Sequence, residues 1–326
     1  MIPQDPIAAA LATINAETIK AFDWLTCELD RRASVTFVPN PGNIGDAAIN
    51  LACYNYLTER FDKVEICAVA DAPRTDCVFI GGGGNAIEPL YGDVCGLLDR
   101  LTPEHRLFMF PASIRGYSGS LRRIAPFARI LCRESISLAH VAEQIGSENV
   151  SLAHDAAFLL APRLRNDFAS RIRKATTAKC RSFRTDMESI HPQLGGNDIM
   201  YDYKSDWTDM MVAHDFVWAV AGYLLGFREV ETDRLHCAIL AAILGRQTIL
   251  RANCYYKNAA VFDHSLSRLP NTTFLPADAR VIAAPHRGIS NFRDIKNFGL
   301  RKLRGLRRRS RWLSLTTLHW RSRHHD

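Results

Sequence analysis

The stretch Asp76-Cys77-Val78-Phe79-Ile80-Gly81-Gly82-Gly83-Gly84-Asn85 joins an apolar run to four consecutive glycines. The apolar run predicts a strand over 76–80, and we expect a helix to open after the glycines and to extend to about Arg100. Glycines at such a junction let backbone N–H groups approach an anion at the start of the helix. The run matches neither Gly-x-Gly-x-x-Gly nor the phosphate loop of a nucleoside triphosphatase. A tight turn with close helix packing explains it equally well, so both interpretations stay open.

Strand-like and helix-like segments alternate on both sides of this stretch. Strands are predicted over 34–38, 64–69, 106–110, 128–132 and 150–153, and helices over 7–30, 46–57 and 135–144. Such alternation is typical of a doubly wound, mostly parallel sheet. In sheets of this kind the ligand-binding loops follow the carboxyl ends of the strands. We therefore look for function in the polar residues that follow each predicted strand.

The alternation is interrupted over 161–179, where the chain is basic and polar and contains Pro162. A second α/β pattern follows, with strands predicted over 180–184, 228–232 and 247–250 and helices over 208–225 and 235–244. The predicted parts are an N-terminal α/β domain over 1–165, a linker over 166–179, a C-terminal α/β domain over 180–285 and a basic amphipathic tail over 286–326. Two such domains, facing one another, would place their strand-end loops around one central cleft.

The composition, 47% hydrophobic and 23% charged, is that of a globular protein. The longest apolar stretches, 215–227 and 235–245, are shorter than the roughly 20 residues that a membrane-spanning helix needs. The N-terminus has no basic stretch leading into an apolar core, so we expect no secretory signal. None of the nine cysteines forms a Cys-x-x-Cys pair. This favours free thiols in a reducing cytoplasm and predicts no metal site.

The net charge of +7 belongs to the end of the chain rather than to the whole. Residues 301–326 hold nine Lys or Arg and one acid, which leaves 32 bases and 33 acids in the rest. Leucines and tryptophans interleave with these arginines, a pattern that suits an anionic membrane surface. A disordered solubilising tail and nonspecific contact with nucleic acid are the alternatives. We expect no specific nucleic-acid partner.

Two polar motifs follow predicted strands of the first domain. Asn43-Ile44-Gly45-Asp46 ends a turn-rich loop, and either its polar side chains face the cleft or Asp46 simply caps the next helix. Arg133-Glu134-Ser135 supplies a guanidinium that can hold a carboxylate or phosphate by two hydrogen bonds, and Ser135 is placed to cap a helix. A local ion pair between Arg133 and Glu134, or an ion pair between the domains, explains this arginine equally well.

The second domain opens with Arg184-Thr185-Asp186-Met187-Glu188, an arginine beside two carboxylates at alternating positions. Asp186 and Glu188 share one face if the strand continues that far. They are then placed to orient a sugar hydroxyl or to act as acid and base. A surface cluster of salt bridges is the alternative interpretation.

Thr232-Asp233-Arg234-Leu235-His236 is the most informative motif, because it places an arginine and a histidine between a predicted strand and an apolar helix. Arg234 can hold an anion, and His236 is the side chain best suited to proton transfer near neutral pH. Further along, Tyr255-Tyr256-Lys257 adds aromatic surface and another cation. An exposed loop is the alternative for this last segment.

Taken in order along the chain, these motifs resemble those of the polysaccharide pyruvyl transferase family. The matching segments are Asn43-Ile44-Gly45-Asp46, Phe79-Ile80-Gly81-Gly82-Gly83, Arg133-Glu134-Ser135, His154-Asp155-Ala156-Ala157-Phe158, Arg184-Thr185-Asp186-Met187-Glu188, Thr232-Asp233-Arg234-Leu235-His236 and Tyr256-Lys257. The resemblance implies an α/β fold of two Rossmann-like domains facing a central cleft, in a GT-B-like arrangement. It also implies transfer of pyruvate from phosphoenolpyruvate to a sugar as a ketal.

The chemistry that the resemblance implies gives the motif residues separate roles. The phosphate and carboxylate of phosphoenolpyruvate need cations, for which the candidates are Arg184, Arg234 and Lys257. His236, with Arg234 beside it, is the candidate acid/base, and Asp186 or Glu188 is the candidate acceptor of the hydroxyl proton. The other residues expected in the cleft are Asn43, Asp46, Gly82, Gly83, Arg133, Ser135 and Asp155. No cofactor is expected.

The basic tail bears on the acceptor. A membrane-bound tail suits an exopolysaccharide oligosaccharide carried on a polyprenyl diphosphate, with the enzyme in the cytoplasm at the inner face of the plasma membrane. A glycosyltransferase that uses a nucleotide sugar is the first alternative, because the same cationic cleft would serve a diphosphate. A non-catalytic basic protein that binds membranes or nucleic acid is the second. Neither the acceptor sugar nor the ketal linkage follows from the sequence.

Overall fold

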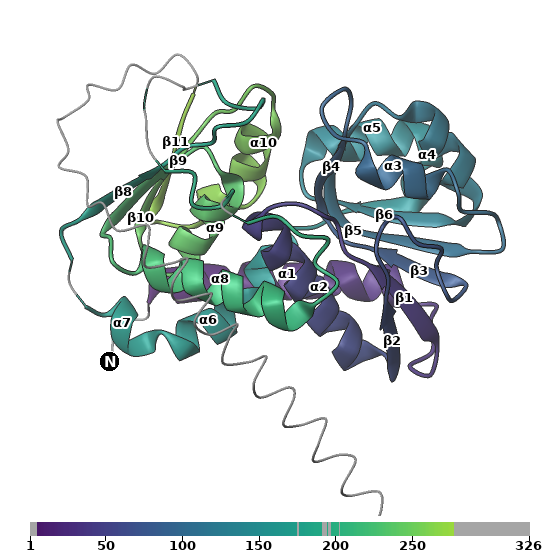
Figure 1. Cartoon of the computed structure of the whole chain (residues 1–326), viewed down its shortest axis with the longest axis horizontal. Coiled ribbons are helices and arrows are strands. Elements are labelled where there is room, and N and C mark those ends of the chain that lie inside the picture. Colours follow the sequence, from purple (N-terminus) through teal and green to yellow (C-terminus); the bar gives the residue numbers. More distant parts are fainter. Residues whose placement is uncertain (1–4, 175, 191–193, 195–196, 202, 277–326) are drawn as a thin grey trace, which may run out of the picture. The chain divides into compact units, whose positions relative to one another are not determined.

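The computed structural model describes residues 5–276 except 175, 191–193, 195, 196 and 202 (Figure 1). The predicted tail over 286–326 lies outside these residues. The described chain contains two separate β-sheets, and the strand pairs within each sheet are parallel. The predicted α/β class with parallel sheets is thus confirmed.

The larger sheet has seven strands in the order β2-β1-β3-β5-β6-β7, with β4 paired to β5. Its strands are β1 (Ser34–Val38), β2 (Lys63–Ile66), β3 (Cys77–Ile80), β4 (Gly83–Ile87), β5 (Arg106–Arg115), β6 (Ala128–Cys132) and β7 (Val150–Leu152). The smaller sheet has the order β11-β10-β9-β8. Its strands are β8 (Lys179–Ser182), β9 (Glu229–Thr232), β10 (Gln247–Arg251) and β11 (Thr272–Leu275).

Helices connect the strands and cover the sheets (Figure 1). They are α1 (Pro6–Thr26), α2 (Ile44–Arg60), α3 (Asp93–Leu98), α4 (Ser118–Ile124), α5 (Ser135–Ile145), α6 (Ala161–Asp167), α7 (Ala169–Ile172), α8 (Met210–Leu224), α9 (Leu235–Ile243) and α10 (Lys257–His264). No helix in the described residues is long and apolar enough to cross a membrane.

Successive side chains of a strand point to opposite faces of the sheet. In the large sheet they pack into two different hydrophobic cores, one on each face. Val78, Ile80 and Leu107 lie in the cluster that α3, α4 and α5 cover. The phenylalanines between them point the other way, so that Phe79 stacks on Phe108 with ring centroids 4.7 Å apart. Phe22 of α1 closes this second core against Phe110. Both faces of the sheet are therefore buried, which suits parallel strands.

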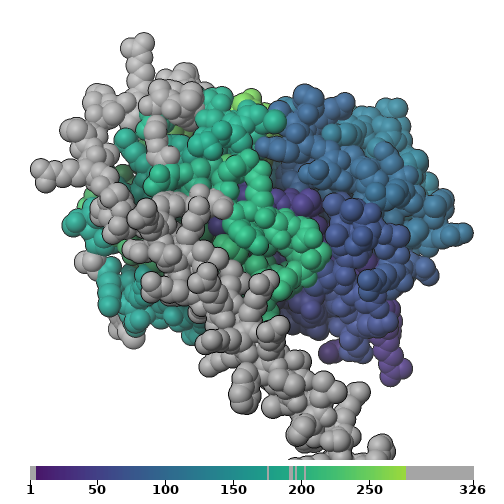
Figure 2. Space-filling model, viewed as in Figure 1, coloured from purple at the N-terminus to yellow at the C-terminus, as the bar shows by residue number. Residues whose placement is uncertain are grey.

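The two sheets belong to one compact unit. Contacts between α2 and α8 are extensive, and Figure 2 shows the green segment that includes α8 lying against the first part of the chain. The Nε1–H group of Trp207, just before α8, donates to the backbone oxygen of Gly42 at 3.0 Å. The predicted domain boundaries and the GT-B-like arrangement stay predictions.

The glycine run does not open a helix, contrary to the expectation. Gly83 begins β4, which pairs with the far end of β5, and the next helix is the short α3. The strand expected to stop at Phe110 continues through Pro111 to Arg115. A register shift between Met109 and Ala112 accommodates the proline, which has no N–H to donate. The extension of β5 therefore pairs with β4, which begins within the glycine run.

Neither Asp46 nor Ser135, the N-cap residues expected from sequence, is the N-cap of its helix. Asn43 caps α2, while Asp46 sits three residues later and accepts from the Asn43 N–H in a reciprocal capping box. Glu134, not Ser135, caps α5 by accepting from the N–H groups of Ile136 and Ser137. The predicted linker over 166–179 is partly helical: it contains α7 and the end of α6.

Candidate active site

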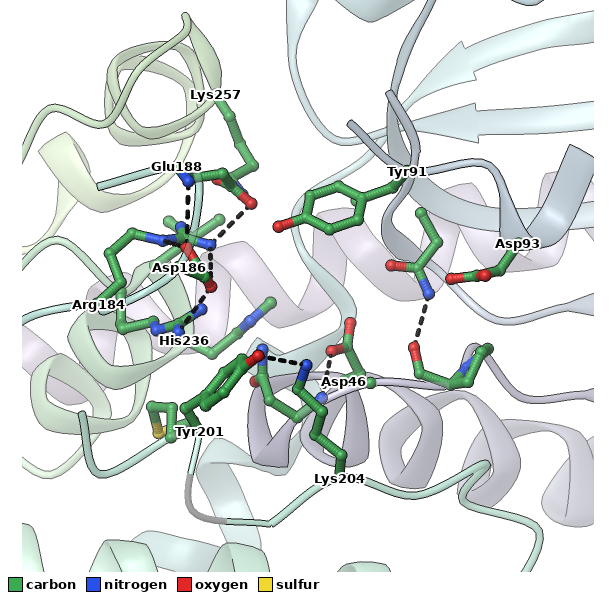
Figure 3. A pocket seen from close by; sticks show the side chains of 18 of the residues that line it. Asp46, Tyr91, Asp93, Arg184, Asp186, Glu188, Tyr201, Lys204, His236 and Lys257 are labelled. Atoms are coloured by element: carbon green, nitrogen blue, oxygen red, sulfur yellow. Dashed lines mark hydrogen bonds and ion pairs between the residues drawn. The ribbon is translucent and has the colours of Figure 1, made fainter. Parts of the chain in front are cut away.

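One pocket collects the loops that follow strands of both sheets (Figure 3). The residues that line it are Pro41, Gly42, Asn43, Asp46, Gly84, Asn85, Tyr91, Asp93, Arg133, Arg184, Asp186, Glu188, Met200, Tyr201, Lys204, Arg234, Leu235, His236 and Lys257. Nine of the residues singled out by sequence are among them. This is the arrangement expected when the carboxyl ends of parallel strands carry the functional loops.

Gly82, Gly83, Asp155 and Ser135, which were also expected in the cleft, do not line this pocket. The Nδ2 group of Asn40 donates to the backbone oxygens of Gly81 and Gly82. These two hydrogen bonds fix the backbone of the glycine run. Asp155 is buried behind His236. Ser135 lines a different depression, between α5 and α10.

His236 stands in the first turn of α9 and is held by Asp155. Its Nε2 atom lies 3.3 Å from Asp155 Oδ2, and its side chain is 13% exposed. The ring also lies over the start of α2, where a Cβ added at Gly45 would collide with Nδ1. The contact between Nε2 and the Asp155 carboxylate fixes the orientation of the imidazole ring.

Arg133 completes this cluster from the end of β6. Its Nη1 group donates to Asp155 Oδ2 at 2.7 Å and lies 3.5 Å from His236 Nε2, and its Nε–H donates to Ser113 Oγ at 2.9 Å. Burial alone would raise the pKa of Asp155, but His236 and Arg133 outweigh it and hold that pKa far below the usual range. Asp155 therefore remains a carboxylate beside the histidine.

Arg184 and its two carboxylates form the second group in the pocket. The guanidinium contacts Asp186 Oδ1 at 2.8 Å through Nε and Glu188 Oε1 at 2.7 Å through Nη2. Its backbone N–H donates to Asp233 Oδ1 at 2.7 Å. Burial works to raise the pKa of Asp186, yet the hydrogen bond and charge of Arg184 lower it overall. These residues do form a salt-bridge cluster, but it lines a pocket rather than an open surface.

Arg234 is the N-cap residue of α9, and two acids hold its guanidinium. Its Nε–H donates to Asp198 Oδ1 at 2.9 Å, and its Nη2 group lies 2.8 Å from Asp186 Oδ2. The guanidinium also lies 5.3 Å from the ring centroid of Tyr201, a cation–π distance. A planar guanidinium held on three sides presents its remaining donors in a fixed direction.

Lys257 begins α10 and pairs with Glu188 Oε2 at 2.7 Å. The charges of Lys257 and Arg184 overcome the effect of burial and lower the pKa of Glu188 to about 2. Burial lowers the pKa of Lys257 to about 8 although Glu188 opposes this. A second anion near Lys257 would favour its charged form.

Several pocket residues have no motif that marks them in the sequence. Tyr91 and Tyr201 add aromatic rings, and Asp198, which does not line the pocket itself, holds Arg234. Lys204 lies over the ring of Tyr201 at 3.9 Å and donates to its hydroxyl at 2.7 Å. Over the described residues, no group of three or more His, Cys, Asp or Glu side chains gathers in a way that could hold a metal ion.

The fold and the pocket together define an α/β protein whose strand-end loops assemble arginines, a lysine and a histidine for an anionic ligand. The model of the family described as polysaccharide pyruvyl transferase matches residues 43–255, and the chain belongs to this family. The resemblance inferred from the ordered motifs is thus confirmed. Membership supports an enzyme that transfers pyruvate to polysaccharide.

A solved structure supports the same fold. The crystal structure of a functionally uncharacterized protein from Klebsiella pneumoniae subsp. pneumoniae NTUH-K2044 aligns with a TM-score of 0.67 and 30% sequence identity. The alignment covers 79% of this chain and 98% of the Klebsiella chain. No curated protein matches the chain.

Proposed function

We propose that this enzyme transfers pyruvate from phosphoenolpyruvate to a sugar as a ketal. The observation that carries the proposal is the meeting of Arg133, Arg184, Arg234 and Lys257 around His236 in one pocket. Phosphoenolpyruvate presents a carboxylate and a phosphate close together, and arginine pairs match both groups by bidentate hydrogen bonds. A donor with two anionic groups therefore suits the pocket.

The acids around these cations keep them in place before the donor binds. Asp155, Asp186, Glu188 and Asp198 each pair with at least one of the four cations. A buried guanidinium without a partner would be costly, so the pairs prevent the arginines from turning away. The donor then replaces or shares contacts in a site whose geometry already exists.

The reaction has two proton transfers that the pocket must serve. The methylene carbon of phosphoenolpyruvate takes a proton while a sugar hydroxyl, losing its own, attacks the adjacent carbon. Phosphate then leaves from that carbon, and a second hydroxyl of the sugar closes the ketal ring. We assign the first proton to His236, because it lines the pocket and Asp155 holds its ring in place.

The position of Asp186 and Glu188 bears on their role. Both were candidates for the base, but both are tied to arginine or lysine and have lowered pKa values. A carboxylate with a lowered pKa is a weaker base. We propose that their main contribution is to orient Arg184, Arg234 and Lys257.

The donor can be tested by incubating the enzyme with phosphoenolpyruvate labelled in its methylene carbon and candidate oligosaccharide acceptors. We expect acceptor-dependent release of inorganic phosphate and label in the sugar product. A glycosyltransferase would instead release a nucleoside diphosphate from a nucleotide sugar and leave phosphoenolpyruvate untouched. That result would reject the proposal.

We further propose that the acceptor is a polyprenyl-diphosphate-linked exopolysaccharide oligosaccharide at the cytoplasmic face of the plasma membrane. Support comes from the arginines interleaved with Leu and Trp over residues 301–326. Co-sedimentation with anionic liposomes should weaken in a chain that ends at residue 300. Equal co-sedimentation of the two chains would remove the membrane role and leave the donor proposal intact.

A further inference from the structure

Asp46 differs from the other acids that line the buried part of the pocket. Asp186 and Glu188 form ion pairs with arginine or lysine. Over the described residues, no ion pair joins Asp46 to a cation within 4.0 Å; its Oδ2 atom accepts from the backbone N–H of Asn43 at 2.9 Å. This leaves a carboxylate in the pocket that is not neutralised by a direct partner.

The chain shapes the space around this carboxylate. Asp46 lies in the first turn of α2, on the same helix end that supports the ring of His236. A Cβ added at Gly42 would collide with Oδ2, and one added at Gly83 would lie 3.4 Å from Oδ1. Figure 3 shows Asp46 lying apart from the cluster of Arg184, Asp186 and Glu188, although all four residues line the pocket.

The surrounding charges also set its basicity. Burial raises the pKa of Asp46 above that of an ordinary aspartate, although the charges of His236, Arg133 and Lys257 and the Asn43 hydrogen bond act against this rise. Asp186 and Glu188 shift in the opposite direction. Asp46 thus lines the pocket with more proton affinity than Asp186 or Glu188.

We propose that Asp46 is the catalytic base that removes the proton from the attacking sugar hydroxyl. The inference rests on the proposed transfer from phosphoenolpyruvate. It assigns the base to the start of α2, the same helix end that supports the ring of His236. It also gives Asp46 a role beyond capping the helix.

The protons balance over the whole cycle. In the first step the hydroxyl oxygen bonds to the central carbon of phosphoenolpyruvate, its proton passes to Asp46, and the double-bond electron pair takes a proton from His236 to form the methyl group. In the second step the bond between that carbon and the phosphate oxygen breaks, and Asp46 returns its proton to the phosphate. The second hydroxyl then bonds to the same carbon and gives its proton to His236. Both side chains regain their starting states.

The test compares two aspartates at helix starts: Asp46 in the capping box of α2 and Asp209, the N-cap of α8. Asp46→Asn keeps an oxygen that accepts from the Asn43 N–H but removes the base. Asp209→Asn makes the same change at the exposed cap of α8, outside the pocket, and serves as the control. We expect Asp46→Asn to lower kcat by about 10²–10⁴-fold, the usual contribution of a general base, with the affinity for phosphoenolpyruvate unchanged. Asp209→Asn should retain wild-type turnover.

The pH profile separates catalysis from capping. In the wild type kcat/KM should rise with pH as Asp46 loses its proton, and this acidic limb should disappear in Asp46→Asn. If Asp46→Asn does not fold, Asp46→Glu keeps a capping carboxylate but moves it, and should lose turnover while still binding phosphoenolpyruvate.

Three outcomes would overturn the inference. The first is wild-type turnover in Asp46→Asn, or in Asp46→Glu where that variant is used. The second is loss of the acidic limb in Asp186→Asn or Glu188→Gln while Asp46→Asn keeps it. In both cases a wild type that still releases phosphate from phosphoenolpyruvate shows that the proposed function survives. The third is a wild type that consumes no phosphoenolpyruvate with any acceptor, which rejects the function and the inference together.

Discussion

At the scale of single residues, His236 depends on two buried side chains from the other sheet. Asp155 contacts its Nε2 atom, and Arg133 contacts the same carboxylate oxygen. The orientation of the proposed acid is therefore set by these neighbours as well as by its own helix. Two substitutions separate these contributions.

Replacing His236 by Ala removes the proposed acid. We expect kcat to fall by about 10²–10⁴-fold, since general acids contribute that much. Asp155 keeps its ion pair with Arg133 in this variant, so the protein should still fold. Steady-state phosphate release and thermal melting check both parts. A folded variant with full activity would show that another group supplies the proton.

Replacing Asp155 by Asn keeps the shape of the side chain but removes the carboxylate that contacts both His236 and Arg133. We expect kcat to fall by about 10–100-fold, because a misplaced catalytic group is costly. Steady-state phosphate release at saturating substrate measures this. Wild-type turnover in the folded variant would argue against the role of Asp155.

At the scale of helices and strands, the start of α2 governs the site. Gly45 lies in its first turn, and the absence of a side chain there leaves room for the ring of His236. Gly96 in α3 is a helical glycine with open space around it. Alanine substitutions at these two glycines separate the effect of alanine on helix stability from its effect on the site.

Gly45→Ala should lower kcat by about 10–100-fold, because the added methyl displaces His236. Gly96→Ala should keep full activity and gain up to about 1 kcal/mol in the free energy of unfolding from better helix propensity. Phosphate release and denaturant unfolding give the two quantities. Equal activities of the two variants would contradict the contact at Gly45.

The elements also show how far sequence could predict this molecule. The strands at 34–38 and 128–132 and the residues Arg184, Arg234, His236 and Lys257 were identified because alternation and strand-end polarity are local signals. β4 was missed, since its pairing depends on β5 continuing through Pro111. Asp198 was missed for a similar reason: it meets Arg234 only through the fold. Arg184 pairs with acids of its own motif, but the partners of Arg133, Arg234 and Lys257 lie far away in the sequence and follow only from the fold.

At the scale of the whole molecule, a pair of stacked histidines links segments that are far apart in sequence. His154 follows β7 and His264 ends α10, with ring centroids 4.5 Å apart. His154 also contacts Glu17 of α1 at 2.8 Å and Ser265 at 2.8 Å. Burial lowers the pKa of His154, although Glu17 opposes this, and lowers the pKa of His264 to about 4, with the charges of His154 and Arg268 adding to the shift.

These histidines should make stability depend on pH. A histidine with a depressed pKa is neutral in the folded state, so its stability contribution is present above the unfolded pKa of about 6.5 and is lost as the pH falls toward 4. Between about pH 7 and pH 5 the wild type should lose more unfolding free energy than His264→Phe, by about 1 kcal/mol. Urea unfolding at both pH values measures this. The same pH dependence in both proteins would exclude His264 as its source.

The central claim is that this pocket binds phosphoenolpyruvate and uses His236 to transfer its pyruvate. The most direct measurement is phosphate release from phosphoenolpyruvate, with and without an oligosaccharide acceptor, by the wild type and by His236→Ala. We predict acceptor-dependent release with pyruvate ketal on the sugar for the wild type, and a rate lower by about 10²–10⁴-fold for the variant. Release of a nucleoside diphosphate from a nucleotide sugar, with no consumption of phosphoenolpyruvate, would contradict the account.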